Sequence, residues 1–119
     1  SKKVIKNKFK INQLIYKLKS ENKKVVAVSA PAKGMTLLNY CKLDKQTLDY
    51  VTEKSKLKIG KFTPGSNIPV LSDKILVKDK PDYALLLAWN FSNEIIKNNQ
   101  EYVNGGGKFI IPIPFPRIV

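Results

Sequence analysis

Residues 24–34, with the sequence KVVAVSAPAKG, decide the fold of this chain. The β-branched apolar run at 25–28 is typical of a buried strand, and Pro31 and the Lys33-Gly34 pair mark a turn into a helix at about 35–41. Such a junction leaves backbone N–H groups unpaired at the start of the helix and aims a partial positive charge outward. An anion such as a phosphate could bind there beside Lys33. A plain turn that starts a helix is an equally open interpretation.

The rest of the chain alternates between strand-like and helix-like patterns. Apolar residues at 11, 14, 15 and 18 predict an amphipathic helix. Strands are expected at 48–52, at the short extended segment 68–70, at the apolar run 82–89 and at 108–112, with helices starting near 35, 72 and 90, a long loop over 53–67 and an extended Pro-rich tail over 112–116. Alternation of this kind predicts an α/β domain with a parallel sheet and helices on both faces.

The length of 119 residues suits a single domain over 1–119, whose basic first segment, 1–10, is a candidate linker. No apolar run approaches the roughly 20 residues that span a bilayer. The charged N-terminus lacks the apolar segment of a signal peptide. Cys41 is the only cysteine, which excludes an internal disulfide and favours a reducing compartment. We therefore expect a cytoplasmic protein with no membrane partner.

The formal charge of +13 raises the question of nucleic-acid binding. Arg117 is the only arginine, although base readout and bidentate phosphate contacts favour arginine. The lysines are spread along the chain, so a solvated basic surface is the preferred interpretation. The chain has no histidine, which removes the usual general base, the common nucleophile pairs and the common zinc ligand. A self-contained hydrolase or metalloenzyme is disfavoured.

Ligands of open parallel sheets bind beyond the carboxyl ends of the strands. The strand at 25–28 delivers residues 29–34 to that edge, and the strand at 48–52 delivers Glu53 and Lys54. Glu53 stands where a dinucleotide-binding fold places its ribose-binding acid, but the glycine fingerprint of such folds is missing. Dinucleotide binding is therefore a weak hypothesis.

The strand at 82–89 delivers Trp89 and Asn90 to the same edge. Each has a structural interpretation that we prefer: core packing for Trp89 and a helix N-cap for Asn90. Glu94 is expected to pair with a lysine on its own helix. Cys41, without a histidine partner, is expected to be a small buried hydrophobe.

Four segments, in order and at compatible spacings, resemble one known family. They are 29–40 (SAPAKGMTLLNY), 58–70 (KIGKFTPGSNIPV), 81–95 (PDYALLLAWNFSNEI) and 107–114 (GKFIIPIP). The family is the C-terminal domain of S-adenosylmethionine-dependent C-methyltransferases, which include enzymes that methylate a carbon of nucleotide-linked deoxysugars. The resemblance covers roughly residues 11–117.

The resemblance implies a Rossmann-like three-layer α/β domain with a mostly parallel sheet of about five strands. It also implies a larger enzyme, in which a zinc-binding segment and a central methyltransferase domain precede this one. That central domain would carry the S-adenosylmethionine site and the catalytic base, so this chain alone would bind no cofactor and be inactive. Its expected partners are the central domain and a nucleotide-sugar acceptor. The implied substrate-binding residues are Lys33, Gly34, Lys58, Pro64, Gly65, Ser66, Asn67, Trp89, Asn90 and Glu94.

The chain departs from the family pattern at four positions. Ala27 and Ser29 replace glycines, Glu53 replaces an aspartate, and Asn67 replaces a histidine. Two rival functions stay open: a stand-alone nucleotide- or CoA-binding module that holds a diphosphate at Lys33, and, ranked last, a basic nucleic-acid-binding domain.

Overall fold

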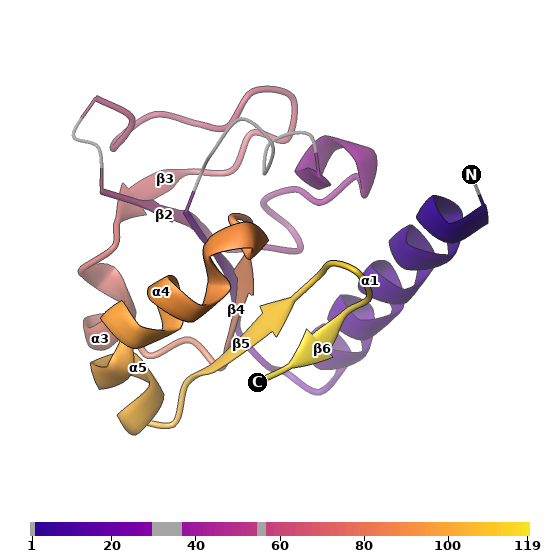
Figure 1. Ribbon diagram of the computed structural model, residues 1–119. Helices are drawn as coiled ribbons and strands as arrows, with labels where there is room; N and C mark the ends of the chain where they lie inside the picture. Colours follow the sequence, from indigo (N-terminus) through magenta and orange to yellow (C-terminus); the bar gives the residue numbers. More distant parts are fainter. Residues whose placement is uncertain (1, 30–36, 55–56) are drawn as a thin grey trace.

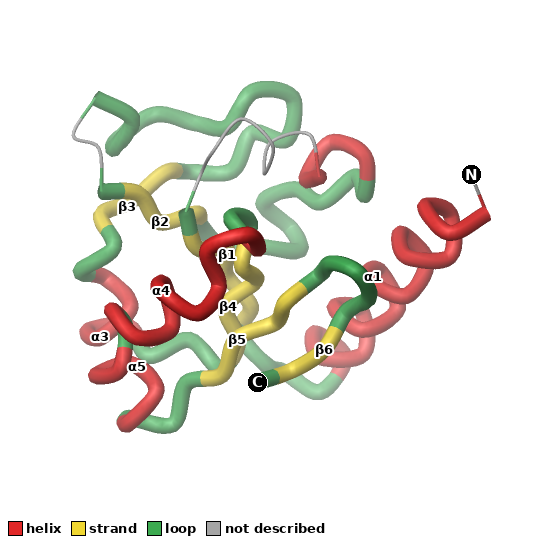
Figure 2. The backbone as a smooth tube through the Cα atoms, in the orientation of Figure 1, coloured by secondary structure: helices red, strands yellow, loops and turns green. Residues whose placement is uncertain are grey.

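The strand β1 (Val25–Val28) is the centre of the molecule, and all four of its residues are buried. The computed structural model describes residues 2–29, 37–54 and 57–119 (Figure 1). β1 pairs in parallel with β2 (Val51–Glu53) on one side and with β4 (Tyr83–Leu86) on the other. β3 (Val70–Ser72) lies outside β2, and β5 (Lys108–Ile111) lies outside β4, both again parallel. β6 (Arg117–Ile118) completes the six-stranded sheet as an antiparallel edge strand on β5 (Figure 2).

The sheet lies between two layers of helix, because alternate residues of each strand face opposite sides. Val25 and Ala27 belong to a buried cluster with Ile11 and Ile15 of the long helix α1 (Lys2–Ser20). On the opposite face, the second buried cluster joins the sheet to α3 (Ile75–Asp79) and α5 (Gln100–Asn104). Figure 1 shows α1 on one side of the sheet and α3, α4 and α5 together on the other. The predicted α/β class, with a mostly parallel sheet and helices on both faces, is confirmed.

Two expectations about the ends of the chain are wrong. Residues 2–10 are not a linker but the first half of α1, which begins at Lys2 rather than near Ile11. Lysine favours helix, and no glycine or proline interrupts this stretch, so the helix anchored by the buried residues from Ile11 onward extends toward the N-terminus. The Pro-rich tail returns to the sheet as β6 because Phe109 and Val119 exchange two backbone hydrogen bonds of 2.9 and 3.1 Å.

The helical region after β4 is divided into three short elements. A single turn, η1 (Trp89–Phe91), leads into α4 (Ser92–Asn98), and α5 follows after a break at Asn99. The side chain of Asn99 donates a hydrogen bond of 2.7 Å to the carbonyl of Ile95. This hydrogen bond stabilises the end of α4. The sequence predicted one continuous helix here, and that expectation is wrong.

The strand order β3-β2-β1-β4-β5-β6 positions the functional site. The chain moves outward from β1 through β2 to β3, and then returns to place β4 on the other side of β1. This order matches that of doubly wound dinucleotide-binding folds, although β6 is antiparallel here. Ligands of such sheets bind beyond the carboxyl ends of the strands, at the point where the order reverses. Here that point lies between β1 and β4.

No helix in the described ranges is both long enough and apolar enough to cross a membrane.

Candidate functional site

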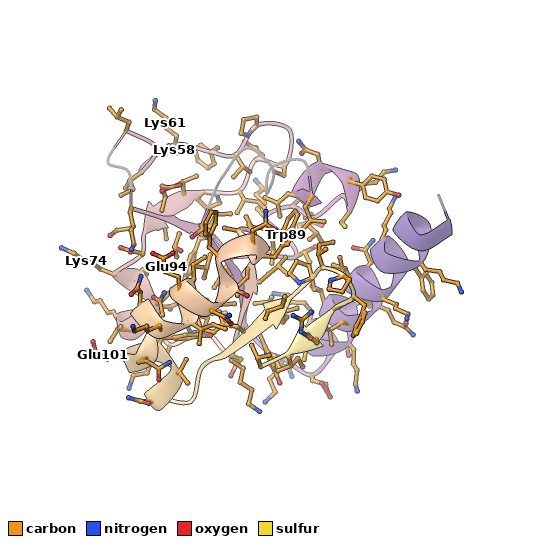
Figure 3. The ribbon with its side chains drawn as sticks, in the orientation of Figure 1. Lys58, Lys61, Lys74, Trp89, Glu94 and Glu101 are labelled. Carbon is orange, nitrogen blue, oxygen red and sulfur yellow. The ribbon has the colours of Figure 1, made fainter. Side chains whose placement is uncertain are left out.

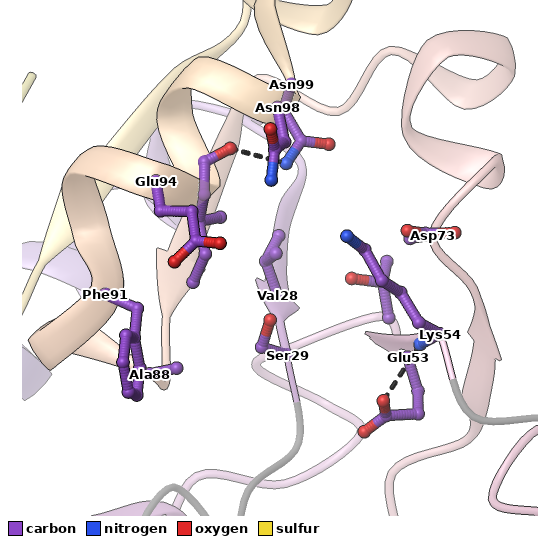
Figure 4. Close-up of a pocket in the computed structure, with 12 residues that line it drawn as sticks. Val28, Ser29, Glu53, Lys54, Asp73, Ala88, Phe91, Glu94, Asn98 and Asn99 are labelled. Carbon is purple, nitrogen blue, oxygen red and sulfur yellow. Dashed lines mark hydrogen bonds between the residues drawn. The ribbon is translucent and has the colours of Figure 1, made fainter.

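A cavity of about 240 Å³ opens at the carboxyl ends of β1, β2 and β4, where the strand order reverses (Figure 4). Val28 and Ser29 lie between its two sides. Phe91 and Glu94 project from the η1–α4 segment on one side, and Glu53, Lys54 and Asp73 lie on the opposite side. Ala88, Ile95, Asn98 and Asn99 complete the lining beside α4, and Thr52 lines it from β2.

The inner wall of the cavity is formed by two neighbouring strand residues. Val28 of β1 and Thr52 of β2 are register partners, so their side chains lie next to each other on the face that α4 covers. Thr52 is 1% exposed. Its hydroxyl oxygen is buried and has no hydrogen-bond partner among the described residues. An orphaned buried hydroxyl is unfavourable and needs an explanation.

The lining is acidic within a basic chain. Glu53, Asp73 and Glu94 contribute carboxylates and Lys54 contributes an ammonium, so the described part of the lining is formally two charges negative whereas the whole chain carries +13. The Glu53 carboxylate accepts a hydrogen bond of 2.9 Å from the backbone N–H of Lys54. An anionic ligand group inside this cavity would lie close to three carboxylates.

Ser29 ends β1 in a backbone conformation that favours glycine. Its φ is +66°, in the left-handed region where the Cβ of an L-residue is crowded. Its N–H donates a hydrogen bond of 3.1 Å to the carbonyl of Thr52, which fixes the turn beside the cavity.

The structure brings together three residues that the sequence placed at strand ends and one, Glu94, that it placed on a helix. Ser29, Glu53, Lys54 and Glu94 all line the cavity. Glu94 is exposed and makes no ion pair in the described part of the chain, so the expectation that it pairs with a lysine on its helix is wrong. Of the ten residues implied by the resemblance, Glu94 alone lines this cavity among those that the structure describes.

The remaining candidates lie around the cavity or elsewhere. Lys33 and Gly34 fall outside the described residues. Lys58 is near the acidic wall, since its ammonium nitrogen lies 3.8 Å from a carboxylate oxygen of Glu53. Trp89 is half-buried and packs against the core cluster on the α5 side, as expected (Figure 3). Asn90 is exposed and caps neither η1 nor α4 through its side chain, so the N-cap interpretation is wrong.

Residues 64–67 form a turn whose polar groups are used internally. The hydroxyls of Thr63 and Ser66 are 2.7 Å apart and buried, and the Thr63 hydroxyl also accepts a 2.9 Å hydrogen bond from the N–H of Ile68. Gly65, at φ +79°, lies so close to the Asn39 side chain that a Cβ would sit 2.8 Å from its amide oxygen. Pro64, Gly65, Ser66 and Asn67 do not line the cavity.

Sequence reasoning missed Asp73, Phe91, Asn98 and Asn99 as site residues. Asp73 was interpreted only as the start of a helix, and the two asparagines fell inside a predicted helix. The Asn98-Asn99 pair carried a usable signal, because asparagine is a poor helix former and marks the break that directs this segment to the cavity.

The described lining of the cavity carries hydrogen-bonding and charged side chains. The chain has no histidine. Cys41 lies in the buried cluster on the opposite face of the sheet, and burial raises the pKa of its thiol despite the nearby charge of Lys8. In the described ranges, no group of three or more acidic or cysteine side chains is arranged to hold a metal ion.

Comparisons with known proteins give a consistent result. Residues 1–114 match the sequence profile of a family described as the C-methyltransferase C-terminal domain. The chain is 42% identical to the C-methyltransferase NovU of Streptomyces niveus over 109 residues, which are 92% of this chain and 26% of that relative. The chain therefore spans about a quarter of the length of the curated relative that it matches.

Proposed function

This chain belongs to the family of C-methyltransferase C-terminal domains, and we propose that it is the substrate-side, non-catalytic domain of an S-adenosylmethionine-dependent C-methyltransferase. The acceptor that we propose is a nucleotide-linked sugar or a similar compound. The observation that carries this proposal is the cavity at the carboxyl ends of β1, β2 and β4, whose described lining offers hydrogen-bonding side chains. The other part of the larger enzyme would supply the methyl donor and the catalytic base.

We propose that S-adenosylmethionine binds in the other part of the enzyme rather than in this cavity. A doubly wound fold holds the anionic or polar part of such a ligand at a glycine-rich turn after its first strand, and Ser29 takes the first position of that turn here. The cavity of about 240 Å³ is also below the roughly 300–1,000 Å³ of pockets that enclose drug-sized ligands. We therefore place the cofactor in the other part of the enzyme.

The contribution of this domain to the reaction would be positional. Holding the acceptor carbon in line with the methyl donor converts a bimolecular encounter into an oriented one, which lowers the entropic part of the barrier. The cavity is built on the ends of three paired strands: Val28 is the register partner of both Thr52 and Leu86, and Ser29 and Ala88 follow β1 and β4 in the chain. A rigid scaffold of this kind is suited to orienting a substrate.

The proposed partner is a central methyltransferase domain of the same polypeptide. The length of NovU, of which this chain matches 26%, leaves room for such a domain. We propose a cytoplasmic location, supported by the single buried free cysteine. The nucleotide- or CoA-module alternative requires a diphosphate at Lys33 and Gly34, which lie outside the described residues, and the acidic lining of the cavity gives it no support.

Calorimetry tests the proposal in two steps. The chain is titrated first with S-adenosylmethionine and then with a panel of nucleotide-linked sugars, UDP-glucose and dTDP-glucose among them. We expect no saturable binding of the cofactor and saturable binding of at least one nucleotide-linked sugar. Micromolar binding of S-adenosylmethionine to the chain would overturn the assignment of a non-catalytic, substrate-side domain.

A further inference from the structure

We propose that the cavity binds the neutral, hydroxyl-bearing ring of the acceptor and that the acceptor's phosphates stay outside it. This inference deepens the proposed function and rests on it for the identity of the acceptor. The ligand class is a pentose or hexose ring. Three features of the described lining support it: its charge, the unpaired hydroxyl of Thr52 and its apolar side.

The charge of the lining excludes phosphate and favours hydroxyl groups. Glu53, Asp73 and Glu94 present carboxylates against the single ammonium of Lys54. A carboxylate has only acceptor positions, so it pairs well with the O–H donors of a sugar and badly with a phosphate oxygen. Lys58, by contrast, lies at the edge near Glu53 and belongs to a lysine-bearing loop that also carries Lys61 (Figure 3). Lys58 therefore lies at the edge of the cavity, whereas three of the four charged side chains in its described lining are acidic.

The Thr52 hydroxyl supplies an independent sign of a missing ligand. It is buried at the cavity and has no hydrogen-bond partner in the described ranges. A hydroxyl can both donate and accept, which is also true of each ring hydroxyl of a sugar. A bound ring would satisfy the group that the ligand-free chain leaves unpaired, and so the cost of the orphaned hydroxyl would be recovered on binding.

The shape and apolar part of the cavity suit a single ring. Phe91 is 62% exposed although it lines the cavity, and Val28 and Ile95 add aliphatic surface. A sugar ring has an apolar C–H face and a rim of hydroxyls, so it could place that face on Phe91 and direct its hydroxyls to the carboxylates. The volume of about 240 Å³ is small for a whole nucleotide sugar, given the roughly 300–1,000 Å³ typical of drug-sized ligands.

Nuclear magnetic resonance of the chain tests this inference with named probes. The ring probes are methyl glycosides of hexoses and 6-deoxyhexoses together with uridine and thymidine; the anionic probes are inorganic phosphate and pyrophosphate. We expect at least one ring probe to shift the backbone amide signals of Ser29, Thr52 and Glu94. Its affinity should change by less than about twofold between low and high salt, because salt screens charge–charge attraction and the ring is neutral.

Thr52→Val is the deciding variant, because it keeps the shape of the side chain and removes the hydroxyl. It should weaken the binding of the ring probe about 2- to 10-fold, whereas Thr47→Val, which lies outside the cavity lining, should not. The inference is overturned if no ring probe shifts the three signals, if pyrophosphate shifts them with salt-sensitive affinity, or if Thr52→Val binds the ring as the parent chain does.

A parallel assay of the full-length enzyme separates this inference from the proposed function. If ring binding depends on Thr52 but Thr52→Val leaves methyl transfer unchanged, the cavity inference holds and its assignment to the acceptor site is wrong. If nucleotide-linked sugars bind the chain but leave Ser29, Thr52 and Glu94 unperturbed, the cavity inference is wrong and the proposed function holds.

Discussion

The ammonium nitrogen of Lys58 lies 3.8 Å from a carboxylate oxygen of Glu53. This contact connects the long loop between β2 and β3 to the acidic wall of the cavity. Lys58 does not line the cavity itself, and its side chain is 54% exposed, whereas that of Glu53 is 16% exposed. A positive group thus stands next to the cavity mouth, in a position to contact a ligand group that extends out of it.

We predict that Lys58→Ala weakens the binding of a phosphate-bearing acceptor about 3- to 10-fold at low salt, because one charge-assisted contact is lost. Binding of a neutral ring probe should be unaffected. The free energy of unfolding should change by less than about 1 kcal/mol, since partly exposed ion pairs contribute little. The measurement is calorimetric titration with and without added salt.

The matched control for that prediction is Lys108→Ala. Lys108 is exposed and begins β5, at the sheet edge opposite the carboxyl ends of the strands. If both substitutions weaken phosphate-bearing ligands equally, the effect comes from the net charge of the chain and the local role of Lys58 is wrong.

Two buried threonines should respond in opposite ways to the same substitution. The Thr63 hydroxyl has two hydrogen-bond partners, Ser66 and the N–H of Ile68, whereas that of Thr52 has none in the part of the chain that the structure describes. Thr63→Val should therefore destabilise the fold by about 1–3 kcal/mol, because it leaves a buried donor unpaired. Thr52→Val should leave stability unchanged or raise it by up to about 1 kcal/mol, because it removes a buried orphan.

Urea unfolding of the two variants and the parent chain measures this difference. An equal loss of stability in both variants would show that the Thr52 hydroxyl has a partner in the ligand-free protein. In that case the inference that the Thr52 hydroxyl pairs with a bound ligand would be wrong.

The sequence was enough to predict the sheet and the edge that carries the site. The runs at 25–28 and 83–86 are apolar throughout, and strands buried on both faces have this pattern. The positions of Ser29, Glu53 and Lys54 followed from strand polarity alone, since parallel strands bring their carboxyl ends to one edge.

The details that sequence could not supply depend on packing between distant segments. The Asn98-Asn99 pair marks the break between α4 and α5, but the orientation in which Glu94 and Asn98 line the cavity depends on tertiary packing. The 64–67 turn looked like a ligand loop by resemblance, but its hydroxyls are used within the turn. The two-residue strand β6 is too short to show any periodicity.

Acid should weaken the fold partly through Asp79. Burial by itself would raise the pKa of this carboxyl, but hydrogen bonds from Lys24 and Tyr50 and the charge of Lys24 outweigh it and hold the pKa below the usual value. A carboxyl whose pKa is lower in the folded state binds fewer protons there than in the unfolded state. Its stabilising contribution is therefore present above the unfolded pKa and is lost as the pH falls through the folded one.

We predict that Asp79→Asn flattens the decline of the free energy of unfolding below about pH 5. Denaturant titrations at intervals between about pH 7 and pH 2 would measure the slope. Glu101→Gln, at an exposed acid of α5 with no ion pair in the described ranges, is the control. If the free energy of unfolding falls with pH at the same slope in Asp79→Asn and in the parent chain, Asp79 does not contribute to the acid sensitivity of the fold.

Ser29→Gly tests whether the backbone conformation of Ser29, beside the cavity, destabilises the fold. Ser29 has φ +66°, which costs a non-glycine residue roughly 1–2 kcal/mol, while glycine loses about 0.5–1 kcal/mol of conformational entropy elsewhere. The net expectation is a gain in unfolding free energy of up to about 1 kcal/mol. Ser92→Gly is the matched control, because Ser92 is right-handed, with φ −55° and ψ −45° at the start of α4, and should lose up to about 1 kcal/mol. If both variants lose stability, the Ser29 side chain stabilises the fold by more than its left-handed backbone conformation costs. If only Ser29→Gly gains stability, the backbone geometry of that turn is strained.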